Sequence, residues 1–165
     1  DLDFIAIDAA TYDNPNCTDT YCEVFHVEGG GIPHQSASDV LKLSSYSEDW
    51  RVVTGNRLYQ FGCDDVTTSC ADLLLIAPDI PQDICIAINR IQDIENPSAD
   101  APRQLDFIDD TPYIGSYPNV GANALIGGTN ATNEAPQVRG KTSGCVYVFG
   151  GGRDTYHFYQ ALIIR

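Results

Sequence analysis

The chain has 165 residues, 43% of them hydrophobic, and its 23 acidic against 9 basic side chains give a formal net charge of −14. A chain of this length and composition folds most simply as a single domain, residues 1–165, with its own core, which argues against wholesale disorder. The strongly negative field argues against nucleic acid and anionic membrane surfaces as partners.

The first third of the chain predicts short strands joined by turns. The opening DLDFIAID alternates and predicts a strand or the end of a helix. Glu23–Glu28 predicts a strand that ends in a Gly-Gly-Gly run, which permits a sharp reversal. Further on, Trp50–Val53 and Leu58–Phe61 flank Thr-Gly-Asn, a pattern that predicts a hairpin.

Two helices are predicted in the middle of the chain. SCADLLLIAP has Ser69 as a candidate N-cap and Asp72 near the positive helix end. The clearest helix begins at Pro81 and is stopped by Pro97. Its expected buried face carries residues at helical spacing with a cysteine beside them: Ile84, Ile88, Ile91 and Cys85.

The last third predicts a long loop and then a hairpin. Residues 97–144 are polar and broken by Pro, Gly and Asn, with one short strand expected at Leu105–Ile108. A loop this long is uncommon unless it is functional or forms a contact face. Cys145–Phe149 and Tyr156–Ile164 are rich in Val, Ile, Tyr and Phe and flank GGGRDT, which predicts a terminal β-hairpin.

The chain has six cysteines: Cys17, Cys22, Cys63, Cys70, Cys85 and Cys145. None has zinc-ligand spacing, and an even count in an acidic chain with two lysines indicates an oxidising compartment and three disulfides. Six cysteines allow 15 pairings. The short spacings favour Cys17–Cys22 and Cys63–Cys70, which leaves Cys85 and Cys145 for one long-range bridge; the alternative is a set of reduced, buried thiols.

No residue carries a catalytic, cofactor-binding or metal-binding signature. Residues 135–142, APQVRGKT, nearly match a phosphate loop, but a strand is predicted after them where the motif needs a helix. His26, His34 and His157 share no metal-ligand spacing and are interpreted as structural histidines. Calcium is the one cofactor considered, at the acidic runs 63–65 and 106–110, where solvated loop charge is the favoured interpretation.

Three segments occur in an order that resembles the globular head of bacterial type IV pilins and pseudopilins. They are CEVFHVEGGGIPHQ, LLLIAPDIPQDICIAINRI and the terminal YHFYQALIIR. Chains of this family show, in that order, a Cys-Glu-x-Phe-His segment with three glycines, a helix with a proline before Cys-x-x-Ile-Asn, and a terminal aromatic strand that ends in Arg.

The resemblance implies an α+β fold, with an antiparallel β-sheet packed against helical segments, stapled by disulfides and ending in a C-terminal hairpin. It implies a structural, non-enzymatic subunit in the periplasm, at the cell surface or in an extracellular filament, with other pilin subunits as partners. Pilins begin with an apolar anchor helix of about 20 residues, which this sequence does not contain. The chain also has no methionine, so we expect it to start after a removed segment and to reach a membrane only through that missing helix.

The residues expected to matter most are the six cysteines, for the integrity of the head, and Gly29, Gly30 and Gly31, for a turn that larger residues would strain. Two alternatives stay open. One is a secreted glycan- or protein-binding module, possibly holding calcium, which would use the long loop and surface tyrosines such as Tyr113 and Tyr117. The other is a small secreted hydrolase that works through a carboxylate pair.

Overall fold

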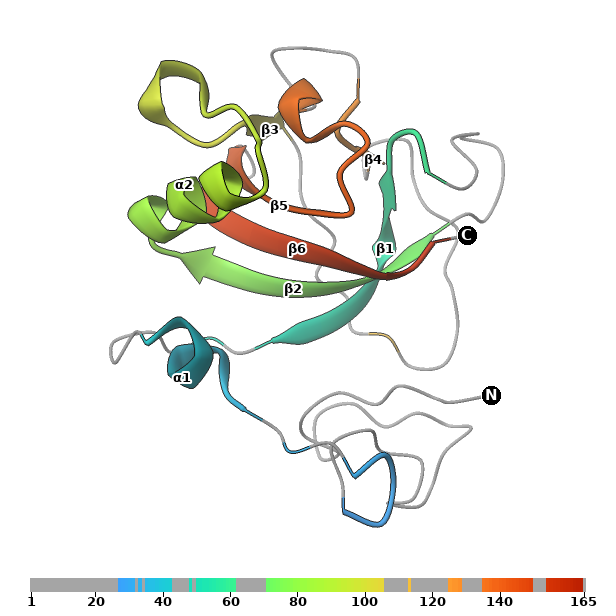
Figure 1. Cartoon of the computed structure of the whole chain (residues 1–165). Coiled ribbons are helices and arrows are strands. Elements are labelled where there is room, and N and C mark those ends of the chain that lie inside the picture. Colours follow the sequence, from blue (N-terminus) through green and yellow to red (C-terminus); the bar gives the residue numbers. More distant parts are fainter. Residues whose placement is uncertain are drawn as a thin grey trace.

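The computed structural model describes residues 27–31, 33, 35–42, 48, 50–61, 71–105, 113, 125–128, 135–149 and 154–164. These residues form a six-stranded sheet and two α-helices (Figure 1). In chain order the elements are α1 (Ala37–Leu41), β1 (Arg51–Leu58), β2 (Asp72–Ile80), α2 (Gln82–Ile91), β3 (Arg103–Leu105), β4 (Leu125–Ile126), β5 (Ser143–Phe149) and β6 (Thr155–Ile163), with short 3₁₀ turns at Pro97–Ala99 and Pro136–Val138.

The sheet is mixed, and the expectation of an antiparallel sheet is correct only for its centre. The strand order is β3-β5-β6-β2-β1-β4, and the four central strands pair antiparallel. The short edge strands β3 and β4 join in parallel, to β5 and β1 respectively. Strand β4 comes from the stretch predicted as loop, and β3 ends at Leu105, where the short strand predicted at Leu105–Ile108 begins. The rest of that predicted strand lies outside the described residues. A long connection lets the chain return to the sheet in the parallel sense.

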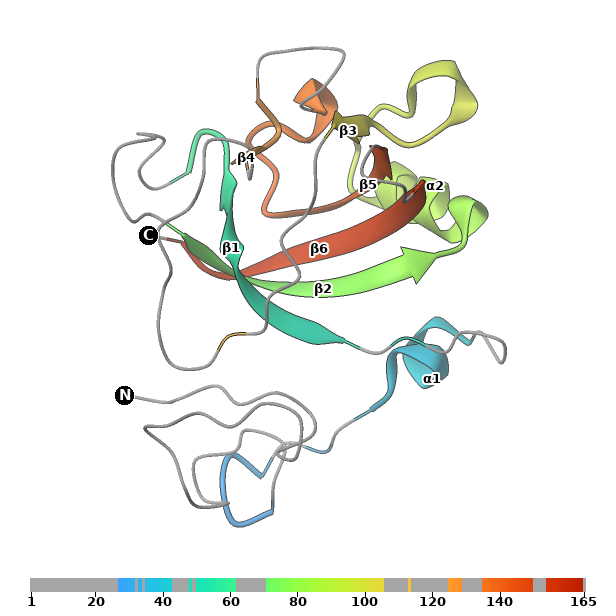
Figure 2. The same cartoon turned by 180° about the vertical axis from the view of Figure 1, so that it is seen from behind.

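The sheet is strongly curved, and β1 crosses the direction of β2 and β6 in both views (Figures 1 and 2). The pairing of β1 with β2 shifts register between Val53 and Asn56. Such an irregularity bends a strand and increases its twist. The curvature brings the two edges of the sheet together, so that Gln104 Nε2 of β3 donates a hydrogen bond of 3.1 Å to the carbonyl of Leu125 in β4.

The predicted hairpin around Thr-Gly-Asn is wrong, because Arg51–Leu58 is one continuous strand. Strand β1 has a neighbour on each side, β2 and β4, and this pairing outweighs the local turn signal. Gly55 lies at the register shift instead of in a turn. A glycine inside a strand often marks such a bulge.

The predicted helix starting near Ser69 is also wrong, because Asp72–Ile80 is strand β2. The strand lies between β1 and β6 and is buried along almost its whole length. A short apolar run of this kind does not distinguish a fully buried strand from a buried helix by periodicity alone. Pairing with β1 on one side and with β6 on the other makes this run a strand.

The predicted helix after Pro81 is confirmed as α2, with Pro81 at its N-cap. Its buried positions are Cys85 and Asn89, flanked by half-buried isoleucines. Ile91 contradicts the predicted face, since 82% of its surface is exposed. The helix ends there, six residues before Pro97, so the proline does not terminate it.

The terminal hairpin is confirmed, and its second strand lies inside the sheet. Strand β6 pairs with β5 on one side and with β2 on the other. Alternate residues of the hairpin face two separate clusters. The concave cluster contains Val53, Leu58, Leu74, Ile76, Ile94, Ile126, Ala135, Val138, Val146, Val148 and Tyr159, and the cluster beneath α2 contains Ala77, Ile80, Cys85, Ala101 and Cys145.

Gly144 in β5 leaves no room for a side chain. A Cβ built there would lie 2.8 Å from Ile94 Cδ1 and 3.2 Å from the Tyr159 hydroxyl oxygen. Ile94 and Tyr159 are both core residues, so Gly144→Ala is expected to lower the free energy of unfolding by about 1–3 kcal/mol in urea titrations. Adding Ile94→Val removes Cδ1 and should recover part of this loss; a double variant less stable than the sum of both single changes would contradict the clash.

Candidate functional site: a helix-to-sheet clamp and an aromatic face

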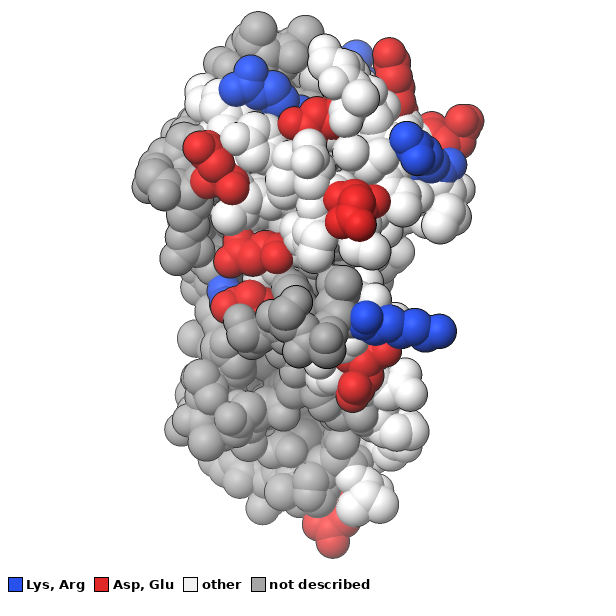
Figure 3. Space-filling model, turned by 90° about the vertical axis from the view of Figure 1, so that its left-hand side faces the viewer, with Lys and Arg blue, Asp and Glu red and all other residues white. Residues whose placement is uncertain are grey.

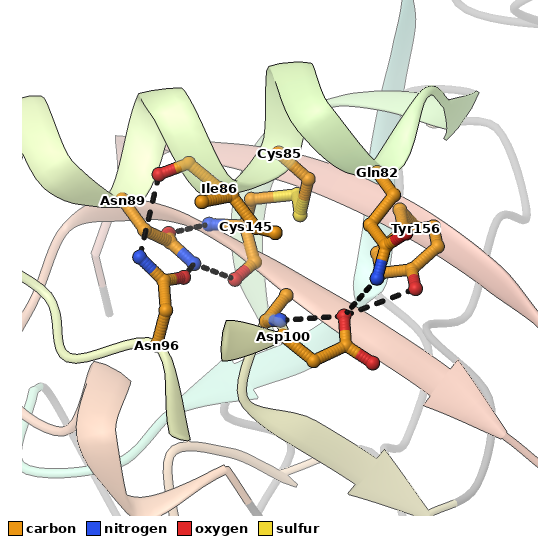
Figure 4. Close-up of a disulfide and its surroundings, with 9 residues drawn as sticks. Gln82, Cys85, Ile86, Asn89, Asn96, Asp100, Cys145 and Tyr156 are labelled. Carbon is orange, nitrogen blue, oxygen red and sulfur yellow. Dashed lines mark hydrogen bonds between the residues drawn. A yellow bond between two sulfur atoms is a disulfide. The ribbon is translucent and has the colours of Figure 1, made fainter. Parts of the chain in front are cut away.

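A disulfide joins α2 to the terminal hairpin. Cys85 in α2 and Cys145 in β5 are bonded across 60 residues of sequence, with their Cα atoms 5.4 Å apart (Figure 4). Both cysteines are fully buried. The long-range bridge predicted from the cysteine spacing is therefore confirmed. The other four cysteines lie outside the described residues.

Asn89, one helical turn after Cys85, holds the backbone of the same residue. Its Oδ1 accepts a hydrogen bond of 2.8 Å from the Cys145 N–H, and its Nδ2 donates one of 2.9 Å to the Cys145 carbonyl. Strand β3 pairs with β5 only from Tyr147 onward, so the side-chain amide takes the place of a neighbouring strand at Cys145. We call Cys85, Asn89 and Cys145 the Cys145 clamp.

The segment that follows α2 forms hydrogen bonds that stabilise the clamp. Asn89 Nδ2 also donates to Asn96 Oδ1 at 2.9 Å, and Asn96 Nδ2 donates to the Ile86 carbonyl at 3.3 Å. The Ile94 N–H donates to the Asn89 carbonyl at 2.8 Å. These bonds turn the chain back against the helix and fix the amide that faces Cys145.

Asp100 ties the start of α2 to β6 and to the approach to β3. Its Oδ1 accepts hydrogen bonds from Gln82 Nε2 at 3.0 Å, from the Tyr156 hydroxyl at 3.0 Å and from the Ala101 N–H at 2.8 Å (Figure 4). Burial, the hydrogen bond to Asp100 and the charge of Asp100 raise the pKa of Tyr156 to about 12. A carboxylate with three donors on one oxygen acts here as a structural joint.

Raising the pH should weaken the fold through Tyr156. Below its ordinary pKa of 10.0 the phenol is neutral in the folded and unfolded states; between about 10 and about 12 only the unfolded chain has lost the proton. The free energy of unfolding should therefore fall across this range. Tyr156→Phe should make the fall less steep in urea titrations at a series of pH values. Equal slopes in the two proteins would contradict this assignment.

Three aromatic rings lie side by side on the hairpin, on the side of the sheet that packs against α2. Tyr147 stacks on Phe149 with centroids 6.3 Å apart and contacts Tyr156 at 5.0 Å. The Arg103 guanidinium lies over the Phe149 ring at 4.1 Å. All three rings are half-buried. We call Tyr147, Phe149 and Tyr156 the aromatic face.

The tyrosines proposed above for ligand binding are placed differently. Tyr113 is only 8% exposed and packs with Val52 and Leu73, because the strand surface offers it an apolar site. Tyr159 offers no surface to a ligand either, since it is fully buried in the concave cluster. Tyr117 lies outside the described residues.

Other predicted features have structural explanations or fall outside the description. His157 is buried, and its Nε2 lies 2.7 Å from Thr155 Oγ1 and 3.9 Å from Asp79 Oδ1, which fits the predicted structural histidine. His26 and His34 are not described. The near-match to a phosphate loop leads into strand β5, so the helix that the motif requires is not there.

The glycine run and the two acidic runs are the remaining features that the sequence analysis singled out. Val27–Gly30 form a turn and Gly31 has φ +64°, a backbone region in which a larger residue is strained. Residues 63–65 and 106–110, considered for calcium, are not described. Among the residues that are described, no three His, Cys, Asp or Glu side chains are grouped to hold a metal. None of the described helices is long and apolar enough to span a membrane.

Charged side chains on the face that carries the helices are mixed in sign. Figure 3 shows acidic and basic side chains interspersed over it, with uncharged surface between them. The basic side chains shown there are not gathered into a patch. On the described part of this face, positive charge is not concentrated in the way that phosphate backbones require.

Comparisons with protein-family models, curated proteins and solved structures found no match for this chain. Its functional assignment therefore depends on its own residues. The established feature is a buried disulfide between a helix and a sheet, which is typical of chains that fold in an oxidising, extracytoplasmic compartment.

Proposed function

We propose that the chain is the extracytoplasmic head of a structural, non-enzymatic subunit of a type IV pilus or pseudopilus. The observation that carries this proposal is the Cys145 clamp, which fastens α2 to the terminal hairpin by one covalent bond and two buried hydrogen bonds. It fastens the helix of one segment on which the resemblance depends, LLLIAPDIPQDICIAINRI, to β5, the strand that pairs with the terminal aromatic segment in β6.

The clamp suits a protein that must keep its shape outside the cytoplasm. Strand β6 lies between β5 and β2, so the hairpin that the clamp fastens to α2 forms part of the middle of the sheet. A disulfide keeps helix and hairpin together in an oxidising compartment, where thiol reductants are scarce. The polar groups described at the clamp are engaged in holding elements together, which fits a structural role.

The pilin-type α+β head is proposed on the same basis. Its antiparallel centre, β5-β6-β2-β1, is packed against α2, and the chain ends on the hairpin. The partners proposed are neighbouring subunits of the same filament.

Assembly in cells tests this proposal. The full-length gene product is expressed in its own host, and surface filaments and envelope fractions are probed with antibody against this head after amine cross-linking. We expect a ladder of cross-linked multimers that contain this chain. A freely secreted monomer in the medium, with no multimers in the filament or envelope fraction, would contradict a filament subunit.

A second candidate is a secreted glycan- or protein-binding module, and the aromatic face favours it. Tyrosine rings with neighbouring charged groups can stack on sugars, and Arg103 and Asp100 flank these rings. If this candidate holds, the head alone should bind a glycan array and lose that binding in Tyr147→Ala. Binding that is absent, or unchanged in the variant, would count against it.

A further inference from the structure

Arg57 in β1 is the largest fully buried side chain among the described residues, with 1% of its surface exposed. Among the described residues, none forms a hydrogen bond with its Nε, Nη1 or Nη2 atom. A guanidinium carries five N–H donors and stays charged at any pH at which proteins fold. Burying an unpaired charge is strongly unfavourable unless an opposite charge accompanies it. Arg57 therefore needs an opposite charge that none of the described residues supplies.

The face on which Arg57 lies follows from its neighbours. Leu58 packs in the concave cluster, and successive strand residues face opposite sides, so Arg57 lies on the other side of the sheet. That side carries Val52, Leu73 and Tyr113. Their apolar surroundings lower the local dielectric and strengthen any ion pair that forms there.

The nearest buried carboxylate on the neighbouring strand is already engaged. Asp72 in β2 is paired in register with Asn56, and its Oδ2 accepts a hydrogen bond of 2.8 Å from the Leu58 N–H. Thr54 is 2% exposed, and its Oγ1 likewise has no hydrogen-bond partner among the described residues. The register shift between Val53 and Asn56 interrupts the alternation of β1, so Thr54, next to the concave residue Val53, lies on the same side of the sheet as Arg57. Strand β1 thus buries a guanidinium and a hydroxyl whose donors no described residue accepts.

We propose that Arg57 binds a small oxyanion, with the Thr54 hydroxyl as a second donor. The ligand class is a carboxylate or an inorganic phosphate, because the planar guanidinium donates two parallel hydrogen bonds to two oxygens of such a group. This site is independent of the filament proposal. It makes the stability of the head depend on anions in the medium.

Thermal unfolding of the whole chain tests the site. Sodium phosphate and sodium acetate are titrated separately at constant ionic strength against sodium chloride. A bound anion stabilises the folded state by mass action, so the Tm should rise and saturate, by about 3 °C or more, with phosphate, acetate or both. The anion that acts identifies the ligand as phosphate or carboxylate.

Variants separate this site from general salt effects. Arg57→Met should fold, because replacing a buried charge by an apolar side chain of similar size is often neutral or stabilising. It should lose the anion-dependent rise, whereas Arg90→Met, at an exposed position of α2, should keep it. Thr54→Val should weaken the response at low anion concentration. It serves as the test variant if Arg57→Met does not fold. A Tm that no anion changes relative to chloride, or an equal rise in Arg57→Met or Thr54→Val, would overturn the proposal.

Discussion

Replacing both Cys85 and Cys145 by alanine is expected to lower the free energy of unfolding by roughly 4 kcal/mol. The bridge closes a loop of 60 residues, and the chain-entropy model assigns about this value to a loop of that length. For a domain of this size the Tm should fall by roughly 8–16 °C. Urea titration of the variant against the unchanged chain measures the loss, and substitution is preferred to reduction because it leaves the other cysteines untouched.

Ile91→Ala is the matched control on the same helix. Ile91 is 82% exposed, so its truncation should change the free energy of unfolding by less than about 0.5 kcal/mol. A double cysteine variant within about 1 kcal/mol of the unchanged chain would contradict the clamp as a main support of the fold. A large effect of Ile91→Ala would mean that the buried face of α2 is not the one described.

Asn89→Ala is expected to lower the free energy of unfolding by about 2–5 kcal/mol even with the disulfide intact. The change leaves the buried N–H and carbonyl of Cys145 without partners, and each unsatisfied group costs about 1–3 kcal/mol. Asn89 is fully buried, so water does not replace the lost bonds at the surface. Urea titration measures the effect, with Arg90→Ala on the exposed side of the helix as control.

The disulfide and the amide act on the same residue, so their effects should not add. Residues that share a partner show interaction energies of about 0.5–3 kcal/mol in double-mutant cycles. Combining Asn89→Ala with the double cysteine variant should therefore depart from the sum of the separate losses by more than about 0.5 kcal/mol. Strict additivity would mean that helix and hairpin are held by two independent contacts.

Features with strong local signals were predictable from the sequence. Two runs rich in β-forming residues around a glycine turn predict the hairpin of Cys145–Phe149 and Tyr156–Ile164. Pro81 and the helical spacing of the apolar residues after it predict α2. The Cys85–Cys145 bridge followed from the short spacings of the other cysteines. Each of these predictions depends on a pattern within a short segment or on the spacing of the cysteines along the chain.

Features decided by tertiary pairing were not predictable. The run Asp72–Ile80 has the same apolar character in a buried helix or strand, and only its position between β1 and β6 makes it a strand. The two edge strands come from a polar stretch with little β-propensity. Their parallel pairing depends on where a long connection returns to the sheet.

The residues that form the site were mostly missed for a related reason. Asn89 follows Cys85 by four residues on the same helix face, and this spacing was the one signal in the sequence that could have indicated it. Its function depends on the backbone N–H and carbonyl of Cys145, which the sequence does not show to be without a neighbouring strand. Asp100 is one of many aspartates in the chain, and nothing in its neighbours distinguishes it. From the sequence, Arg57 is indistinguishable from an ordinary surface arginine, because only the structure shows that β1 buries it.

The coding sequence upstream of Asp1 tests the filament proposal most directly. The proposal predicts a short basic leader that ends in glycine, followed by about 20 apolar residues with a glutamate near their start, which would anchor the subunit before assembly. A cleavable signal that ends in small residues, followed directly by Asp1 with no retained apolar helix, would contradict it and make the chain a freely secreted domain.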